Sequence, residues 1–496
     1  MKSKWMRLLA LLVVACMMLS VFCACADDTT EEGQDPDDQG QQGNTDTPGD
    51  QVEEDIVYTA DIPEGYSAGG QDFTVYTFPE EVFVWKDFDW QHVGTLNSDR
   101  INDAVFQRSS QVAEELDLNI NFFCGQSYAD PAEFKNSCSS GDGEFAIGNI
   151  TMLNHIAMVQ SGYLMDLNTY GEIDLEAPWW DQNIQSDLSI LDKNFALTGD
   201  IGTMYKRSIA IIIFNKVMMR NLGEADPYEY IDTHEWTIEK LVEMAGEVSM
   251  DLDSNDKWDE NDRYGMIYFS DVICAMEIGA GVKYAEIIDG VPELTINSDE
   301  AIDVLNLAAE LLYDKELSYN NSGFTEENMW RMFMADQALF YYGELHSAED
   351  MRASESDFGL MPIPLYDEYQ EEYHHTVNPN VAAVIVIPIT NLDETLTSYA
   401  LDALGAASKN ILTPAYYDIN LQGVVSRDEE SAVTLDLVIS TLAYDPGYQY
   451  ILEAGAMLRN LVQSKSSSFT SSYEAQESVM TTKIEKILEA IQDKYS

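Results

Sequence analysis

Twelve residues in the middle of the chain carry oxygen-bearing side chains at the spacing of a calcium-binding loop. The stretch DLDSNDKWDEND runs from residue 251 to 262 and has a carboxylate or amide at loop positions 1, 3, 5, 9 and 12. These side chains belong to Asp251, Asp253, Asn255, Asp259 and Asp262, and the backbone carbonyl of Lys257 falls at position 7. Calcium prefers oxygen ligands at this spacing, so the stretch predicts a calcium site.

Two positions of this stretch depart from the usual calcium loop. Asp256 stands at position 6, where glycine normally supplies a left-handed backbone, and Asp262 at position 12 is shorter than the usual glutamate. Both changes weaken binding, yet calcium modules outside cells work at about 10⁻⁴ to 10⁻³ M. Residues 263–269 predict a strand, so an ion here would brace a helix-loop-strand unit. The alternative is a solvated acidic turn that holds no ion.

Aromatic and acidic residues after the first predicted strand form a second candidate functional group. Aromatic rings stack on the apolar C–H faces of sugars, and carboxylates accept hydrogen bonds from sugar hydroxyls. Trp85, Asp87 and Trp90 lie in FPEEVFVWKDFDW, directly after a predicted strand at 70–77. Open α/β sheets bind ligands at the carboxyl ends of their strands, so this position favours a sugar-binding site. The alternative role of the rings is core packing.

Six further residues extend this candidate ligand site. Each is aromatic or acidic: Trp179, Trp180, Asp200, Tyr205, Tyr341 and Tyr342. Most tryptophans in proteins pack in cores, so the set as a whole is a stronger prediction than any one member.

The sequence contains none of the common enzyme motifs. A nucleophile elbow, a Walker A loop and a dinucleotide fingerprint are all absent, and His234-Glu235 lacks the second histidine of a zinc protease motif. We therefore expect a protein that is not an enzyme. The 88 acidic residues leave a glycan-degrading hydrolase as the alternative, because such enzymes need only a pair of carboxylates.

Helices and strands must alternate to position these residues. A strand at 70–77, an amphipathic helix at 97–116 and a second strand at 118–123 open the fold, in the order typical of a parallel sheet. Short β-branched or aromatic runs alternate with helical stretches along the rest of the chain. The later predicted helices cover residues 236–248, 299–313, 395–408 and 473–494. The sequence therefore predicts an α/β fold throughout.

The N-terminus predicts export. Three cations precede an apolar run at residues 8–22, which is typical of a signal peptide and too short to span a membrane comfortably. The run ends in Phe22-Cys23-Ala24-Cys25, which resembles a bacterial lipobox, so we expect a signal peptide at 1–24 and lipid on Cys25. The mature protein would then sit on the outer face of the cytoplasmic membrane. The alternative is cleavage at Ala24-Cys25-Ala26 and free secretion.

The composition after Cys25 predicts a tether and restricts the partners. Residues 25–65 are acidic and poor in apolar side chains, so we expect them to be disordered. The formal net charge is −62, and it is −65 without residues 1–24, which carry three cations and no acids. Such a field repels nucleic acid and favours neutral or cationic ligands. Cys124 and Cys138 are a candidate disulfide pair in an oxidising compartment.

Six segments in order carry a resemblance to a known family. The chain is similar to the extracellular solute-binding proteins of family 1, the lipid-anchored receptors of ABC importers, many of them for sugars, from about residue 70 to 490. The segments are GYLMDLNTY, APWWDQNIQSDLSI, FALTGDIGTMYKRSIAIIIFNK, DPYEYIDTHEWTIEKLVEMA, FGLMPIPLYDEYQEEY and NVAAVIVIP.

This resemblance implies a type II periplasmic-binding-protein fold, in which two lobes enclose a ligand cleft. It places the first crossing between lobes near 208–214 and the return near 377–381. Lobe I would comprise residues 66–209 and 380–415, and lobe II residues 210–379 and 416–496. The implied function is that of a monomeric receptor, which closes about a hinge on a carbohydrate and delivers it to the transmembrane subunits of an ABC permease. Peptides or polyamines are the alternative ligands, because the negative field attracts them.

Overall fold

The computed structural model describes residues 56–79, 89–92, 94–223, 227–320, 326–351, 357–391, 393–424 and 430–495. The chain divides into two compact units, Met1–Ile56 and Val57–Ser496. The predicted signal peptide, Cys25 and most of the predicted tether therefore lie outside the described residues. Within the described ranges, no helix is both long enough and apolar enough to cross a membrane.

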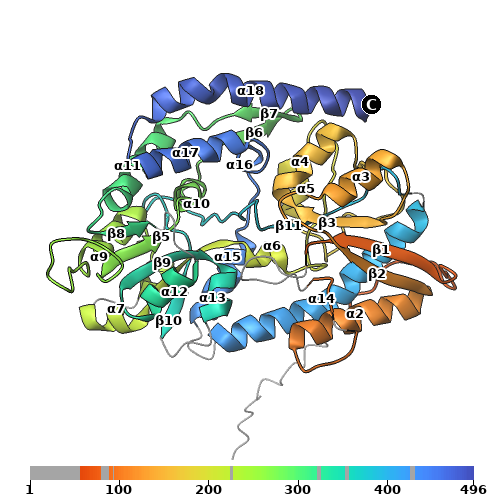
Figure 1. The fold of residues 1–496 in the computed structure, drawn as a ribbon, viewed down its shortest axis with the longest axis horizontal. Helices are drawn as coiled ribbons and strands as arrows, with labels where there is room; N and C mark the ends of the chain where they lie inside the picture. The colour runs from red at the N-terminus through yellow and green to blue at the C-terminus, as the bar shows by residue number, and fades with distance from the viewer. Residues whose placement is uncertain are drawn as a thin grey trace, which may run out of the picture. The chain divides into compact units, whose positions relative to one another are not determined.

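The first sheet of the second unit has four strands in the order β11-β3-β1-β2 (Figure 1). Three strands run parallel, and β11 pairs antiparallel with β3. The bounds are β1 Gln71–Thr77, β2 Leu118–Cys124, β3 Ile147–Thr151 and β11 Ala383–Val386. Parallel neighbours need crossover connections, which helices in this part of the chain supply. We refer to this sheet and its helices as lobe I.

The second sheet has five strands in the order β10-β4-β9-β5-β8, and we refer to it and its helices as lobe II (Figure 1). The strand β5 runs parallel to β8 and β9, whereas β4 is antiparallel to β9 and β10. The bounds are β4 Ala210–Asn215, β5 Tyr264–Tyr268, β8 Ser318–Asn320, β9 Ala338–Glu344 and β10 Phe358–Met361. All residues of β4, β5 and β9 are buried, because helices cover both faces.

Helices connect and cover the strands, as the sequence predicts. Their bounds are α2 Arg100–Leu116, α3 Ala132–Ser140, α4 Met152–Ser161, η1 Leu167–Thr169, α5 Gln182–Leu188, α6 Met204–Arg207, α7 Lys216–Leu222, α8 Pro227–Asp232, α9 Ile238–Gly246, α10 Val272–Gly279, α11 Asp299–Leu312, α12 Glu326–Met334, α13 Leu345–Met351, α14 Glu394–Val424, α15 Glu430–Ser440, α16 Pro446–Tyr450, α17 Leu452–Ser464 and α18 Phe469–Lys494. A hairpin, β6 Ala285–Ile288 and β7 Val291–Leu294, follows α10.

Capping side chains explain where two predicted helices begin. Asp99 precedes α2 and accepts a hydrogen bond from the amide of Asn102. Ser298 precedes α11 and accepts one from the amide of Ala301. Each cap satisfies a backbone N–H that the first turn of a helix leaves unpaired. The helices predicted at 97–116 and 299–313 therefore begin at residues 100 and 299.

The chain crosses from lobe I to lobe II just before β4 and returns between β10 and β11. At the crossing, Ile209 pairs antiparallel with Val377. The amide of Asn378 donates to the carbonyl of Ser208 over 3.0 Å. These residues lie within the crossings near 208–214 and 377–381 that the resemblance implies. The two crossing segments therefore support each other where the lobes meet.

The residues at the end of the predicted tether are packed rather than free. The side chain of Asn410 accepts from the amide of Tyr58 over 3.0 Å and donates to its carbonyl over 2.7 Å. The Lys409 ammonium lies 5.0 Å from the Tyr58 ring centroid. Ile62 packs against the lobe I core. Residues 58–65 therefore belong to the folded unit, because their few apolar side chains find a surface to cover.

Two other expectations concern boundaries and cysteines. The change of lobe expected at residue 415 falls inside α14, which continues through Pro414 to Val424. No disulfide joins Cys124 to Cys138 in this structure, so the candidate pair is not formed.

Candidate functional site

The carboxyl ends of two parallel strands in lobe II meet at one edge of the sheet. Ile267 of β5 lies opposite Tyr341 of β9, and the two strands run in the same direction. The segment Phe269-Ser270-Asp271 follows β5, and β9 ends at Glu344. Ligands of open α/β sheets bind outside the carboxyl ends of the strands. This edge is therefore the part of lobe II to search for a ligand site.

An ion pair lies at this edge and remains partly exposed. Arg459 of α17 donates from Nη1 to Oδ1 of Asp271 over 3.1 Å. The side chains are 26% and 24% exposed, respectively. Burial raises the pKa of the Asp271 carboxyl, although the Arg459 guanidinium beside it acts in the opposite direction. A guanidinium has five N–H donors, so this pair offers both donors and an acceptor to ligand hydroxyls.

An aromatic pair lies beside the ion pair. The Phe269 ring meets the Tyr342 ring edge to face, with centroids 4.9 Å apart. Phe269 is half-buried and Tyr342 is buried, so Tyr342 supports a ring that still reaches solvent. Burial raises the pKa of the Tyr342 hydroxyl well above its ordinary value. Phe269 is thus a candidate stacking platform for an apolar ligand face.

Glu344 joins the same edge to the crossing between lobes. The side-chain amide of Asn378 donates to Oε1 of Glu344 over 2.8 Å. Nδ1 of His346 lies 3.4 Å from Oε2 of the same carboxylate. The backbone amide of Asn378 donates to the carbonyl of Ser208 in the first crossing. A displacement of Glu344 would therefore reach both crossing strands.

Lobe I presents threonine and asparagine side chains at the carboxyl ends of its parallel strands. Nδ2 of Asn149 donates to the hydroxyl of Thr77 over 3.2 Å, and Nδ2 of Asn154 donates to the hydroxyl of Thr151 over 2.8 Å. The amide of Leu153 donates to the carbonyl of Pro379, in the return crossing, over 2.9 Å. The polar end of β3 therefore adjoins the crossing that Glu344 contacts from lobe II.

Trp90 packs inside lobe I. It is 3% exposed, and the Arg108 guanidinium lies 4.8 Å from its ring centroid. Arg108 also donates to the carbonyls of Asp89 and Ile201, over 2.6 and 2.8 Å. The other predicted residues of this loop, Trp85 and Asp87, lie outside the described residues.

The predicted residues between 179 and 205 are also buried in lobe I or at its margin. Trp179 and Trp180 belong to the lobe I core, and Nε1 of Trp180 lies 3.4 Å from a carboxylate oxygen of Asp402. The Asp200 carboxylate pairs with two ammonium groups, those of Lys206 at 3.0 Å and Lys409 at 2.8 Å. Tyr205 is 6% exposed. These contacts stabilise lobe I.

The two predicted tyrosines of β9 point in opposite directions, as successive strand residues do. The Tyr341 hydroxyl accepts from Nε1 of Trp330 in α12 over 3.1 Å, away from the ion pair. Tyr342 contacts Phe269. Tyr342 is therefore the described member of the predicted set that joins the lobe II edge.

Sequence reasoning missed Phe269, Asp271, Glu344 and Arg459. Phe269 ends the strand predicted at 263–269 and Asp271 follows two residues later, so the strand-end rule applied to the first strand would also select them. Arg459 has no local signal, because it arrives from a helix 188 residues away in the chain.

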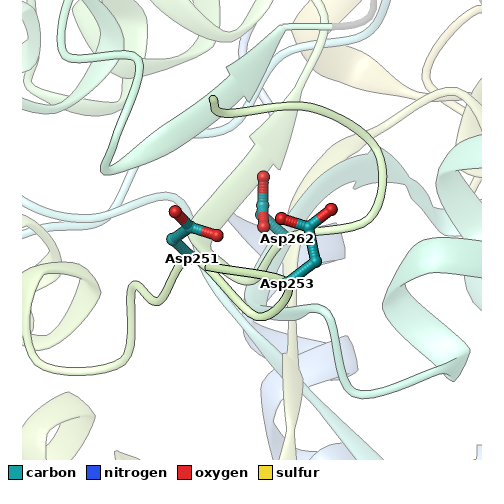
Figure 2. Close-up of side chains that lie close together, drawn as sticks. All are labelled: Asp251, Asp253 and Asp262. Carbon is teal, nitrogen blue, oxygen red and sulfur yellow. The ribbon is translucent and has the colours of Figure 1, made fainter. Parts of the chain in front are cut away.

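Three acidic residues of the predicted calcium loop converge (Figure 2). Carboxylate oxygens of Asp251, Asp253 and Asp262 all lie within 4.8 Å of one another. Calcium–oxygen distances are about 2.3–2.6 Å, so one ion fits between oxygens at this separation. Asp262 is fully buried, whereas Asp253 is exposed. The group thus has one fixed carboxylate and two at the surface.

The loop backbone has the shape that the sequence motif needs. Asp256 at position 6 has φ of +58°, the left-handed conformation that glycine usually supplies. Asp251 accepts from the amides of Ser254 and Asp256 over 2.7 and 2.8 Å. Burial acts to raise the pKa of the Asp251 carboxyl, but these amides lower it overall. Burial and the neighbouring carboxylates raise the pKa of the Asp253 carboxyl.

The remaining predicted ligands make bonds within the loop. The Asn255 side-chain oxygen accepts from the amide of Lys257 over 2.7 Å. The Asp259 carboxylate accepts from the amide of Asn261 over 3.0 Å, and Asp259 is not among the three convergent carboxylates. Of the predicted ligands, the three carboxylates of Asp251, Asp253 and Asp262 therefore converge in the described geometry.

A scan with protein-family models gives no match, and a search of curated protein sequences gives none either. Solved structures do match. An ABC substrate-binding protein from Listeria monocytogenes, in complex with cycloalternan, has 12% identity and a TM-score of 0.54 over 85% of this chain and 99% of that chain. A cyclo/maltodextrin-binding protein complexed with maltotetraose has 11% identity and a TM-score of 0.54 over 85% and 97%.

A third match is the GacH receptor of Streptomyces glaucescens, described with acarbose, at 12% identity and a TM-score of 0.53 over 85% and 99%. At these identities the likeness is one of fold. It confirms the predicted two-lobe architecture over nearly the whole of each matched chain.

Proposed function

We propose that this chain, which has the two-lobe fold of ABC-importer solute-binding proteins, is a carbohydrate receptor that serves an ABC permease. The observation that carries the proposal is the arrangement of Phe269, Asp271 and Arg459 at the carboxyl edge of lobe II. A half-buried ring stands beside an accessible donor and acceptor, which is what a sugar ring with hydroxyl edges requires. The matched structures named with saccharides support the same ligand class.

Hinge closure would provide the mechanism. A ligand at the edge of lobe II touches lobe I only when the lobes approach, so it binds the closed form more tightly and shifts the population towards it. The contacts of Glu344 with Asn378, and of Asn378 with Ser208, run directly from the ligand edge into the crossing strands. A permease would then recognise the closed form.

The local charge balance favours a neutral ligand. The chain has a net charge of −62, which attracts polyamines and basic peptides at long range. At the lobe II edge, however, the Asp271 carboxylate is paired with the Arg459 guanidinium at 3.1 Å. A polyamine would have to compete with that guanidinium for the carboxylate, whereas sugar hydroxyls can bond to both groups.

A ligand panel tests the function. Thermal unfolding is measured with neutral oligosaccharides and polyols, with spermidine and with short peptides, because a ligand at 100 times its dissociation constant adds about 2.7 kcal/mol of stability. We expect stabilisation by a saccharide and no cleavage of it. Release of shorter saccharides would instead support a hydrolase, and a preference for spermidine or peptides would support the alternative ligand classes.

Attachment to the membrane is a separate proposal that rests on the sequence. We propose that Cys25 carries lipid and holds the exported receptor on the outer face of the cytoplasmic membrane. Labelled fatty acid should enter the wild-type protein and the Cys23→Ser control, but not the Cys25→Ser variant. Equal labelling of the Cys25→Ser variant would contradict the proposal.

We also propose that the loop at 251–262 binds one calcium ion with a structural role. The convergence of the Asp251, Asp253 and Asp262 carboxylates supports this. The loop connects α9 to β5, so an ion would brace the start of the strand whose other end carries Phe269 and Asp271.

A further inference from the structure

Four chain segments lie in order across the crossing between the lobes. Glu344 at the end of β9 pairs with Ala210. The Ala210 amide donates to the carbonyl of Thr376 over 3.1 Å, and the neighbouring His375 pairs with Leu442. The crossing strands thus separate the carboxyl end of β9 from the segment at 441–443. Contacts made beyond Leu442 lie on the opposite flank of the hinge from Glu344.

Two tyrosines on that opposite flank bind lobe I. The Tyr444 hydroxyl donates to Oδ2 of Asp181 over 2.8 Å, and the Tyr444 amide donates to Oδ2 of Asp187 over 3.0 Å. The Tyr450 hydroxyl donates to the carbonyl of Leu188 over 3.0 Å. All three acceptors lie in α5 or directly before it. We refer to these three hydrogen bonds as the rear latch.

The two sides of the rear latch belong to different lobes. The Asp181 amide donates to Thr198 over 2.9 Å, beside Leu197, which pairs with Ile385 of the lobe I sheet. On the other side, the Tyr284 amide donates to Oδ2 of Asp445 over 2.7 Å, which ties the residue after Tyr444 to lobe II. Relative movement of the lobes at this flank must therefore stretch or break the rear latch.

The latch is buried, and two surface hollows adjoin it. Tyr444 and Tyr450 are 2% and 4% exposed, and burial raises the pKa of the Tyr444 hydroxyl well above its ordinary value, so the hydroxyl keeps its proton. Two hollows of about 370 and 790 Å³ open between α5 and lobe II, and Asp187 lines both. Tyr444 and Tyr450 belong to the same buried cluster as Ile184 and Leu188 of α5, so separating the two sides of the latch also exposes apolar surface.

We propose that the rear latch opposes closure of the ligand cleft and so sets the apparent affinity of the receptor. Because the hinge strands lie between the latch and Glu344, rotation that brings the lobes together at Glu344 separates them at Tyr444. Breaking the latch then costs free energy that ligand contacts must offset. This inference concerns regulation of the site in the proposed function, but lobe separation is measurable without any ligand.

The experiment measures the distance between the lobes in ligand-free protein. Residues 1–24 are removed, Cys25 and Cys124 are changed to serine, and nitroxide labels are placed at Gln126 and Asp350. Both positions are exposed and follow the carboxyl ends of strands, β2 in lobe I and β9 in lobe II. Electron–electron double resonance then compares the parent protein with latch and control variants.

Tyr444→Phe removes one latch hydrogen bond and keeps the ring, and Tyr450→Phe does the same at the second tyrosine. The control is Tyr313→Phe, because the Tyr313 hydroxyl donates to the Ser466 carbonyl over 2.7 Å within lobe II. One hydrogen bond corresponds to about a two- to tenfold change in an equilibrium. We expect each latch variant to raise the population of the shorter distance by about that factor, and the control to leave it unchanged.

Three results would overturn the proposal. The distance distribution could be unchanged in both latch variants, it could move to longer distances, or it could shift equally in the Tyr313→Phe control. A circular-dichroism melt of each variant confirms that it is folded. Because Tyr444→Phe and Tyr450→Phe act on separate bonds, either folded variant suffices for the test. A failure here leaves the carbohydrate panel unaffected, so the two proposals fail separately.

Discussion

Arg459 donates a hydrogen bond to Asp271 over 3.1 Å, although the two residues are 188 positions apart in the chain. The contact brings α17 to the start of α10, where β5 ends. One element of the site is thus assembled only when the last third of the chain has folded onto the lobe II sheet.

This pair makes the first prediction. Arg459→Lys keeps a positive charge near Asp271 but loses the planar set of donors, so saccharide affinity should fall about tenfold or more. Titration calorimetry measures the change. The control is Lys483→Met, which breaks an ion pair of similar exposure between Lys483 of α18 and Glu453 of α17. The Lys483→Met variant should bind the saccharide with wild-type affinity. An Arg459→Lys variant with unchanged affinity would remove this pair from the site.

The burial of Trp90 makes the second prediction. Its ring is 3% exposed beneath the Arg108 guanidinium, so Trp90→Ala should lower the free energy of unfolding by about 3–5 kcal/mol. Urea unfolding measures this loss. Saccharide affinity of the fraction that remains folded should stay close to that of the wild type. A stable Trp90→Ala variant that no longer binds saccharide would restore Trp90 to the ligand site.

The third prediction concerns the loop at 251–262. If one calcium ion is bound there, chelation should lower the melting temperature, because saturation at ten times the dissociation constant adds about 1.4 kcal/mol. A variant with Asp251→Asn and Asp253→Asn should melt at the same temperature with and without calcium. If neither chelator nor added calcium changes the melting temperature of the wild type, the loop is an acidic turn without an ion.

Asp445 makes the fourth prediction, on pH. Burial raises its pKa from 3.8 to about 7, although the amides of Tyr448 and Tyr284 act to lower it. A carboxyl whose pKa is higher in the folded state contributes most to stability below pH 3.8, and this contribution is lost as the pH rises through 7. Asp445→Asn should therefore flatten the dependence of melting temperature on pH between about 4 and 7. An equally steep dependence in the variant would assign the effect to other groups.

The fold could be predicted in large part from the sequence. The strand at 70–77 and the helix at 97–116 differ from the structure by a few residues, because their apolar periodicity and capping residues are local signals. The composition predicts a tether that extends to residue 65, because composition alone does not show that Tyr58 meets Asn410, 352 residues away. Long-range contacts of this kind leave no mark on a local pattern.

The site could be predicted only in part. The rule that ligands gather at strand ends, applied to the first strand, selects Trp90, which folds inward onto Arg108. Its aromatic ring makes Tyr342 a candidate ligand residue, and the structure places it beneath Phe269 rather than at the surface. Residue type shows which chemistry is available, whereas exposure depends on neighbours that come from distant parts of the chain.

Calorimetric titration of the wild type and a Phe269→Ala variant with the best saccharide of the panel tests the central claim most directly. The account predicts saturable binding at one site per chain in the wild type. It predicts a loss of affinity of about ten- to a hundredfold in Phe269→Ala, with a melting temperature close to that of the wild type. Equal affinity of the two proteins for the saccharide, at equal stability, would contradict a carbohydrate site at the carboxyl edge of lobe II.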